Sequence, residues 1–391
     1  MLYNDLDNKD SVLKVGDKYG YDYRFNIFNE KVWAIAKFSF PFIDFHLGAD
    51  VGSSQYWREG LMRNGLFPDN SKGNSEIKSF LNFGVKAGLT YKINGRNYLI
   101  LNGSAISAAP TINNVFLSPR THNKYVDNLN NEKYFSADFS YLVTYPIFKM
   151  RLTGYYTQFY DISKLTTFYH DEYGALVNYS MTGIDQRYMG IELGFDLKLG
   201  NRFSLVGAAN IGDYTYTNNP EVTIIADNGY AMLIGDEISA SHTVYFKNYH
   251  VAAGPQVAGS VGIKYNYDYW WAGINVNYFD RMYADMNPER RTTAARGTLD
   301  ENSELFHSII DQTRLKRQFT VDASLSKSWR VKKYIIGFNL SATNILNNKN
   351  LVTTAWEQYR FDYKKNDVNK YPIKYYYAFG TTFYAGFNIT F

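Results

Sequence analysis

Large apolar side chains alternate with small or polar ones over long stretches of the chain. In the last segment, the odd positions from Tyr375 to Phe391 are mostly aromatic or aliphatic, and the even positions from Tyr376 to Thr390 are mostly small or polar. A period of two places these sets on opposite faces of a β-strand, and it does not produce a helix face. The same alternation recurs in the segments 80–91, 188–199 and 319–326.

Segments of this kind fill most of the chain, and helical periodicity is nearly absent. The small-residue face is rich in Gly, Ser, Asn and Thr, whereas a soluble β-sandwich would show more Lys, Glu and Arg to solvent. This composition indicates a crowded or water-filled interior. The pattern predicts an all-β fold of about fourteen strands. Their expected spans are 19–28, 31–39, 43–56, 77–92, 96–106, 133–145, 148–161, 186–198, 202–215, 243–265, 270–283, 316–328, 332–345 and 374–391.

Short and long connections alternate between these strands. Tight hairpins are expected at Asn94-Gly95, Pro146-Ile147 and Gly200-Asn201, and near Tyr267-Asp268 and Arg330-Val331; Asn-Gly between alternating runs is a strong hairpin signal. The long polar segments are 57–76, 107–132, 162–185, 216–242, 284–315 and 346–373. Counting back from the C-terminus places every long segment at one end of the sheet. Because outer-membrane barrels have short periplasmic turns and long extracellular loops, we expect an antiparallel transmembrane β-barrel.

Composition narrows the functional classes. The chain has 391 residues and a net charge of 41 − 37 = +4, which is too small a surplus for a dedicated nucleic-acid binder. It has no cysteine, which excludes disulfides and thiolate metal sites. No apolar run approaches the roughly 20 residues of a membrane-spanning helix. The 36 Tyr, 27 Phe and 6 Trp suit the aromatic girdles of a barrel, and the Trp residues expected near strand ends are Trp33, Trp270, Trp271 and Trp329.

Three stretches and the C-terminus together resemble one known family. The stretches are NNEKYFSADF at 130–139, LTGYYTQFYD at 152–161 and LSATNILNNK at 340–349. Their order and their distances from the terminal Phe391 are similar to those in the C-terminal part of the barrel of TonB-dependent outer-membrane receptors. This resemblance covers nearly the whole chain. It implies residence in the cell outer membrane and active uptake of a scarce nutrient.

The resemblance also implies that residues 1–391 are one portion of a larger barrel. Transporters of this type have 22 strands, so about 22 − 14 = 8 strands would precede the chain. The signal peptide, TonB box and plug domain of the family are not visible in the sequence. The implied partners are outer-membrane lipid and lipopolysaccharide, the barrel-assembly machinery, the TonB complex through the missing plug, and a small-molecule or glycan substrate.

The long segments contain arginines beside aromatic residues, a combination that stacks on rings and pairs with anions. The candidate ligand residues are Trp57, Arg58, Arg290, Arg291, Trp356 and Tyr359. Alternatively, these loops pack on one another or contact lipopolysaccharide. At the C-terminus, Phe387, Ile389 and Phe391 resemble the signal that the barrel-assembly machinery recognises.

No motif for catalysis, phosphate binding or metal binding stands out, and the six histidines lack a recognised metal-ligand spacing. We therefore expect no enzyme activity and no cofactor. The leading hypothesis is a receptor component whose substrate the sequence does not define, because siderophores, haem, cobalamin, oligosaccharides and peptides all suit the family. The alternatives are a complete fourteen-stranded passive channel and a soluble all-β binding protein.

Overall fold

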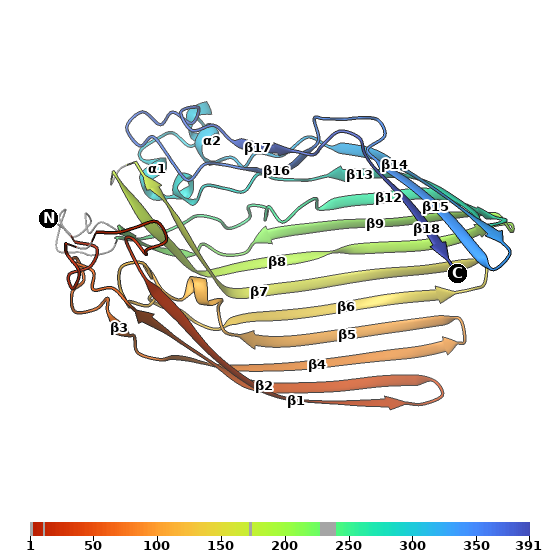
Figure 1. Ribbon diagram of the computed structural model, residues 1–391, viewed down its shortest axis with the longest axis horizontal. Coiled ribbons are helices and arrows are strands. Elements are labelled where there is room, and N and C mark those ends of the chain that lie inside the picture. Colours follow the sequence, from red (N-terminus) through yellow and green to blue (C-terminus); the bar gives the residue numbers. More distant parts are fainter. Residues whose placement is uncertain (1–2, 11, 172–173, 227–239) are drawn as a thin grey trace.

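The computed structural model describes residues 3–10, 12–171, 174–226 and 240–391, and β-strands dominate these ranges (Figure 1). They form a 16-stranded antiparallel sheet, which confirms the predicted all-β class. Neighbouring strands along the main path are β1 (Tyr23–Ser39), β2 (Ile43–Gly60), β4 (Lys78–Asn94), β5 (Asn97–Ala108), β6 (Glu132–Thr144), β7 (Phe148–His170), β8 (Ala175–Leu199), β9 (Phe203–Tyr216), β12 (Val257–Tyr267), β13 (Trp270–Asp280), β14 (Gln318–Val331), β15 (Tyr334–Thr343) and β18 (Thr382–Thr390).

Shorter elements decorate this path. Within the sheet, β3 (Gly73–Asn74) pairs with β2, and β10 (Glu221–Ala226) bridges β8 and β11 (Ala240–Thr243). A separate hairpin joins β16 (Val352–Trp356) to β17 (Lys374–Tyr377). The helices are brief: η1 (Ile112–Asn114), η3 (Pro288–Arg291), α1 (Thr293–Arg296) and α2 (Glu304–Ile310). No helix in the described ranges is long and apolar enough to cross a membrane.

Some predicted strand limits are wrong. The predicted strand 243–265 is interrupted, since β11 ends at Thr243 and β12 begins at Val257. The segments 19–28 and 31–39 form one strand that begins at Tyr23, because Asn29 and Glu30 keep regular pairing with Ser54 and Ser53 instead of turning. The segment 374–391 is interrupted, since Lys374–Tyr377 pairs with β16 and only Thr382–Thr390 pairs with β15. Asn347 Oδ1 accepts a hydrogen bond from the Thr381 backbone N–H at this break.

The predicted sorting of connections is present in the structure. Tight turns lie at one end of the sheet, and the long connections and helices lie at the other (Figure 1). Asp268 and Tyr269 both have positive φ values, 49° and 59°, as a two-residue hairpin of the favoured hand requires. From here on, the two ends are called the turn end and the loop end.

The segment 162–185 is not a long loop, in contrast to the prediction. β7 and β8 continue to His170 and Ala175, so this hairpin extends beyond the neighbouring strands. Two register shifts near Asp161, whose φ is 58°, mark the place where the regular wall ends and the extension begins. The extension buries Val177 and Tyr179 in an apolar cluster with Val222 and Phe246, which explains why the strands persist. Residues 227–239 of the predicted segment 216–242 lie outside the described ranges.

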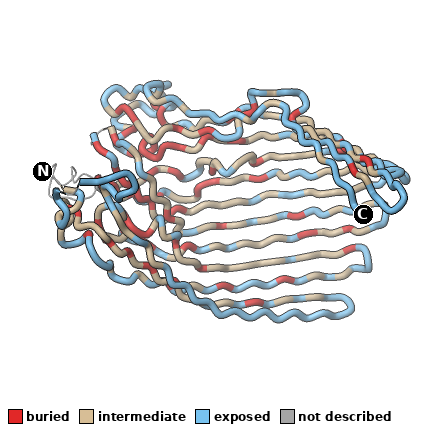
Figure 2. The backbone as a smooth tube through the Cα atoms, viewed as in Figure 1, coloured by how far each residue is buried: buried red, intermediate tan, exposed pale blue. Residues whose placement is uncertain are grey.

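The two faces of the sheet differ as the alternation predicts. One face carries large apolar side chains that stay exposed, and cross-strand pairing joins them into a belt: Val276 of β13 lies opposite Val261 of β12 and Val321 of β14. Leu81 and Phe83 continue the belt on β4, where Leu81 is 67% exposed. Figure 2 shows exposed and partly buried residues along most of the sheet, with buried residues concentrated at the loop end. The apolar core therefore lies among the loops, not between two stacked sheets.

The sheet has two outer strands, β1 and β18. Each pairs with one neighbour on the main path, β1 with β2 and β18 with β15. In Figure 1, β1 lies along the lower margin of the sheet.

Candidate functional site

The polar face of the sheet carries a network of side-chain hydrogen bonds between neighbouring strands. Asn102 Nδ2 on β5 donates to Asp138 Oδ1 on the neighbouring strand β6 at 3.0 Å, and Ser136 Oγ on β6 lies 2.9 Å from Thr157 Oγ1 on β7. Short polar side chains at every second position can reach across to the next strand in this way. The result is a hydrophilic wall that lies on the face opposite the apolar belt.

A hollow of about 820 Å³ lies against this wall. Its charged lining residues are Asp138, Arg151 and Glu192. The Arg151 guanidinium donates to Ser140 Oγ from Nη2 at 3.2 Å. This surface offers hydrogen-bond donors, hydrogen-bond acceptors and charges of both signs.

One part of the loop end brings together four of the six predicted ligand residues, Arg290, Arg291, Trp356 and Tyr359. Arg290 and Arg291 lie in η3, and both guanidinium groups turn towards the C-terminal end of α2. Arg290 Nε donates to the Ile309 carbonyl at 2.8 Å, and Arg291 donates to the carbonyls of Ile310 and Asp311 at 3.1 and 3.0 Å. These carbonyls lack partners within such a short helix, so the two arginines cap α2.

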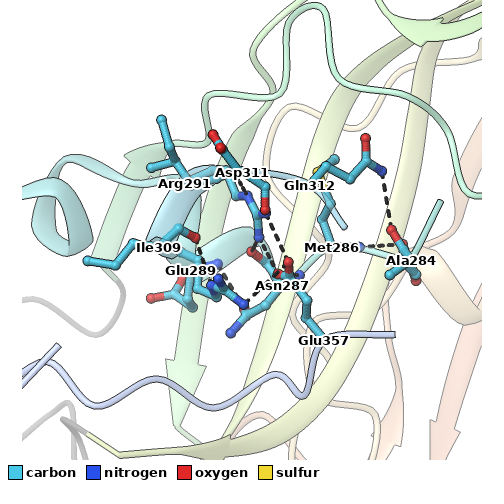
Figure 3. Close-up of polar contacts among 12 residues, drawn as sticks. Ala284, Met286, Asn287, Glu289, Arg291, Ile309, Asp311, Gln312 and Glu357 are labelled. Atoms are coloured by element: carbon cyan, nitrogen blue, oxygen red, sulfur yellow. Dashed lines mark hydrogen bonds and ion pairs between the residues drawn. The ribbon is translucent and has the colours of Figure 1, made fainter. Parts of the chain in front are cut away.

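Glu357 joins the same network from the loop between β15 and β18. Its carboxylate pairs with both Nη atoms of Arg291, and Figure 3 shows the two side chains facing each other beside Asn287. Arg291 and Glu357 are only 1% and 2% exposed. A buried pair of this kind is costly to break, because the remaining partner keeps an uncompensated charge. Arg290 and Arg291 therefore hold the loops together, and their contact with a ligand stays a prediction.

Trp356 and Tyr359 lie next to Glu357. The Trp356 ring stacks on Tyr376 of β17 with centroids 4.8 Å apart. The Tyr359 hydroxyl accepts a hydrogen bond from Lys164 Nζ at 3.2 Å. Both side chains are partly buried, so each keeps some surface that a ligand could touch.

Trp57 and Arg58 belong to a different part of the loop end. Arg58 is 1% exposed and donates to the Ser71 carbonyl at 2.8 Å and to the Pro119 carbonyl at 2.7 Å. It therefore ties the loop after β2 to the loop after β5. The structure does not join these two residues to the Arg291–Glu357 network.

One buried cluster at the loop end escaped the sequence analysis. Glu289 of η3 contacts His170 Nε2 at 3.1 Å and His242 Nε2 at 3.2 Å, and it accepts a hydrogen bond from the Tyr363 hydroxyl. Burial opposes ionisation of Glu289, but the hydrogen bonds from the two histidines outweigh it and lower its pKa. The four residues come from four segments, so no local spacing could have revealed them. In the described ranges, no group of three or more His, Asp or Glu side chains could hold a metal ion.

The proposed assembly signal lies on the outer strand β18 and on the residue that follows it, Phe391. Phe387 pairs with Phe338, and Ile389 pairs with Ile336. The side chains of Phe387 and Ile389 are exposed, and Phe391 is 91% exposed.

Comparisons with known proteins complete the description. No protein-family model and no curated protein matches the sequence. Among solved structures, the chain is similar to the ferric-catecholate import receptor Fiu from E. coli K12, with a TM-score of 0.56 and 12% identity over 96% of this chain and 46% of that one. The siderophore receptor PiuA from Acinetobacter baumannii gives a TM-score of 0.62 and 11% identity over 94% and 44%. The FrpB iron transporter from Neisseria meningitidis gives 0.57 and 10% over 95% and 46%.

These similarities establish the fold. The sheet has the fold of part of the β-barrel of TonB-dependent outer-membrane receptors, as the sequence resemblance predicted. It spans less than half the length of each of these structures.

Proposed function

We propose that the chain forms part of the barrel and the outer loops of an outer-membrane receptor that imports a scarce nutrient by TonB-coupled active transport. The loop end would face the outside of the cell, and the turn end would face the periplasm. The fold of the solved receptors and the sorting of connections to two ends both support this orientation.

The exposed apolar belt is the observation that carries the proposal. Side chains such as Leu81, Val261 and Val276 would face water on a soluble protein, and soluble monomers rarely expose continuous apolar patches larger than a few hundred Å². Against lipid the same belt is favourable, while the polar wall faces a water-filled lumen. Membrane lipid and lipopolysaccharide are therefore the partners proposed for the outer face.

The remaining parts of the transporter would come from outside residues 1–391. We propose that β1 and β18 pair with further strands of one larger barrel, and that a plug with a TonB box occupies its lumen. The coverage of less than half of each solved receptor is consistent with this division. In that arrangement TonB acts on the plug, and the chain described here supplies part of the wall and part of the ligand-contacting surface.

We propose a path for the solute that is based on the loop end and the polar wall. A ligand would first meet the loop end and then pass along the wall beside Asp138, Arg151 and Glu192. Short polar side chains can exchange hydrogen bonds with water and with the solute, so passage needs no covalent step.

A growth experiment tests the proposal. The locus that encodes the chain is deleted, and growth is measured on limiting iron, cobalamin and defined glycans, with and without an intact TonB system. Loss of growth on one source that requires TonB names the ligand class. Uptake that persists without TonB would contradict active transport and would favour a passive channel.

A labelling experiment tests the two faces directly. The chain has no cysteine, so in a single-cysteine variant the maleimide can label the chain only at the introduced residue. In intact outer membranes, a water-soluble maleimide is expected to label Ser260→Cys, which lines the hollow, and to spare Val276→Cys on the belt. Equal labelling of both positions would contradict the assignment of lipid and lumen.

A further inference from the structure

A second hollow, of about 460 Å³, lies at the loop end away from the polar wall. Its lining consists of two phenols, two amides and two cations and includes no Asp or Glu: Asn219, Tyr245, Lys247, Asn248, Tyr249 and Arg296. The volume is within the range of small-molecule sites. We call this hollow the cationic pocket.

The two cations of the cationic pocket are not neutralised by neighbouring carboxylates in the described ranges. The Arg296 guanidinium lies over the ring of Tyr245 at 4.8 Å and over that of Phe306 at 5.6 Å. The Nε atom of Arg296 is buried and has no hydrogen-bond acceptor among the described residues. Lys247 is exposed. By contrast, Arg290 and Arg291 deeper in the same loops share Glu357.

The frame around the cationic pocket is firmly held. The backbone N–H of Tyr245 donates to the Arg291 carbonyl at 2.8 Å, and that of Asn248 donates to the Tyr216 carbonyl at 2.9 Å. Asn219 Oδ1 accepts the Lys247 backbone N–H at 2.9 Å. Asn248 has a φ of 75°, a left-handed conformation that Asn tolerates well. Three backbone hydrogen bonds thus fix the segment 245–248, so the pocket is formed without a ligand.

We propose that the cationic pocket binds a small organic anion that presents a phosphate or carboxylate group to Arg296 and Lys247. The planar guanidinium suits the paired oxygens of either group, and the ammonium adds a second charge. The phenol and amide groups of the lining can hydrogen-bond to the hydroxyls of an attached sugar-sized body. This inference rests on the proposed function, because it assigns a substrate or membrane ligand to the outward-facing loops.

Binding of a matched pair of probes tests the charge requirement. Glucose 6-phosphate and glucose differ by one phosphate group and are of a size that suits the pocket. Using the full chain in detergent, calorimetry is expected to show binding of glucose 6-phosphate, competition by inorganic phosphate, and weakening by added salt. Equal binding of glucose, or no binding of either probe, would overturn the proposal.

Variants locate the site. Arg296→Gln is expected to weaken binding of glucose 6-phosphate by about tenfold to a hundredfold, because a charge-assisted hydrogen bond is lost. Lys247→Gln changes an exposed side chain, so it should fold normally and weaken binding by about threefold to tenfold. Lys364→Gln removes an exposed lysine outside the pocket and should leave affinity unchanged. Unaltered affinity in Lys247→Gln and Arg296→Gln would place the anion elsewhere and refute the assignment.

The phosphate could belong to a free solute or to the lipopolysaccharide around the barrel. To distinguish these sources, lipopolysaccharide with or without its phosphate groups is added to the chain with bound glucose 6-phosphate, and the displacement of glucose 6-phosphate is measured. Displacement only by the phosphorylated form identifies a lipid-borne ligand, whereas failure of both forms to displace identifies a free one. The two proposals fail separately: binding in a chain that supports no TonB-dependent uptake would leave the cationic pocket standing and remove the transport function.

Discussion

Replacing Val276 by arginine gives a quantitative test of the lipid-facing belt. Val276 lies 276 − 270 = 6 positions along β13 from Trp270, on the same face of the strand. With a rise of about 3.3 Å per residue and a strand tilt of about 40°, this separation is about 15 Å along the membrane normal. The apolar band of an outer-membrane barrel is about 25 Å tall. If Trp270 marks one edge of that band, Val276 lies close to its middle.

The expected cost follows from this depth. An arginine on the lipid face destabilises a barrel by about 2–4 kcal/mol near the bilayer midplane. On a soluble protein the same change would be nearly neutral, within about 0.5 kcal/mol, because Val276 is already 50% exposed. The two environments therefore predict different magnitudes for one substitution.

The assay is denaturant unfolding of the chain in lipid vesicles, followed by tryptophan fluorescence. Ser260→Arg is the matched control, because Ser260 lines the hollow of the polar wall and a long side chain can extend into water there. We expect Val276→Arg to lower the free energy of unfolding by about 2–4 kcal/mol and Ser260→Arg to change it by less than about 0.5 kcal/mol. Equal effects of the two variants would refute the argument that Val276 faces hydrocarbon.

Three further predictions concern the loops and the C-terminus. Glu357→Gln leaves the Arg291 guanidinium buried beside a neutral partner, so the loop end should lose about 3–5 kcal/mol of local stability. Trypsin should therefore cut the chain faster within residues 281–317. An unchanged cleavage rate would contradict the structural role of the pair. Burial and the nearby charge of Arg58 lower the pKa of His122 from 6.5 to about 4, so its neutral form favours the fold. That contribution to stability is complete above pH 6.5 and is lost as the pH falls towards about 4. Hydrogen exchange in residues 109–131 should become faster over this pH range in the native chain but not in His122→Gln. The same pH dependence of exchange in both chains would refute a role for His122 protonation. Phe391→Ala should reduce the amount of chain in the outer-membrane fraction without changing its unfolding midpoint in vesicles, and normal membrane levels would argue against an assembly signal at the exposed terminus.

Some loop features could not be predicted from sequence because distant segments create them. Lys164 and Tyr359 are 195 positions apart and form one hydrogen bond. Glu289 gathers His170, His242 and Tyr363, which no spacing relates to it. The aromatic and arginine content suggested contact with a ligand, which stays a prediction. What the sequence could not show is that Arg291 donates hydrogen bonds to carbonyls at the end of α2 and pairs with Glu357. Composition records which groups are present but not which groups neutralise one another.

The sequence alone determined the two-faced sheet, the tight turns and the sorting of connections to two ends. These features follow from a period of two and from local turn chemistry, which act over neighbouring residues and depend little on the rest of the fold. Only the tertiary structure decided that 19–39 contains one strand, that the hairpin around 162–185 extends beyond the neighbouring strands, and which cations have no carboxylate partner among the described residues. Those outcomes depend on the free energy of burying Val177, or of pairing Arg291, with partners far along the chain. The alternation of apolar and polar residues does not specify which distant residues come into contact.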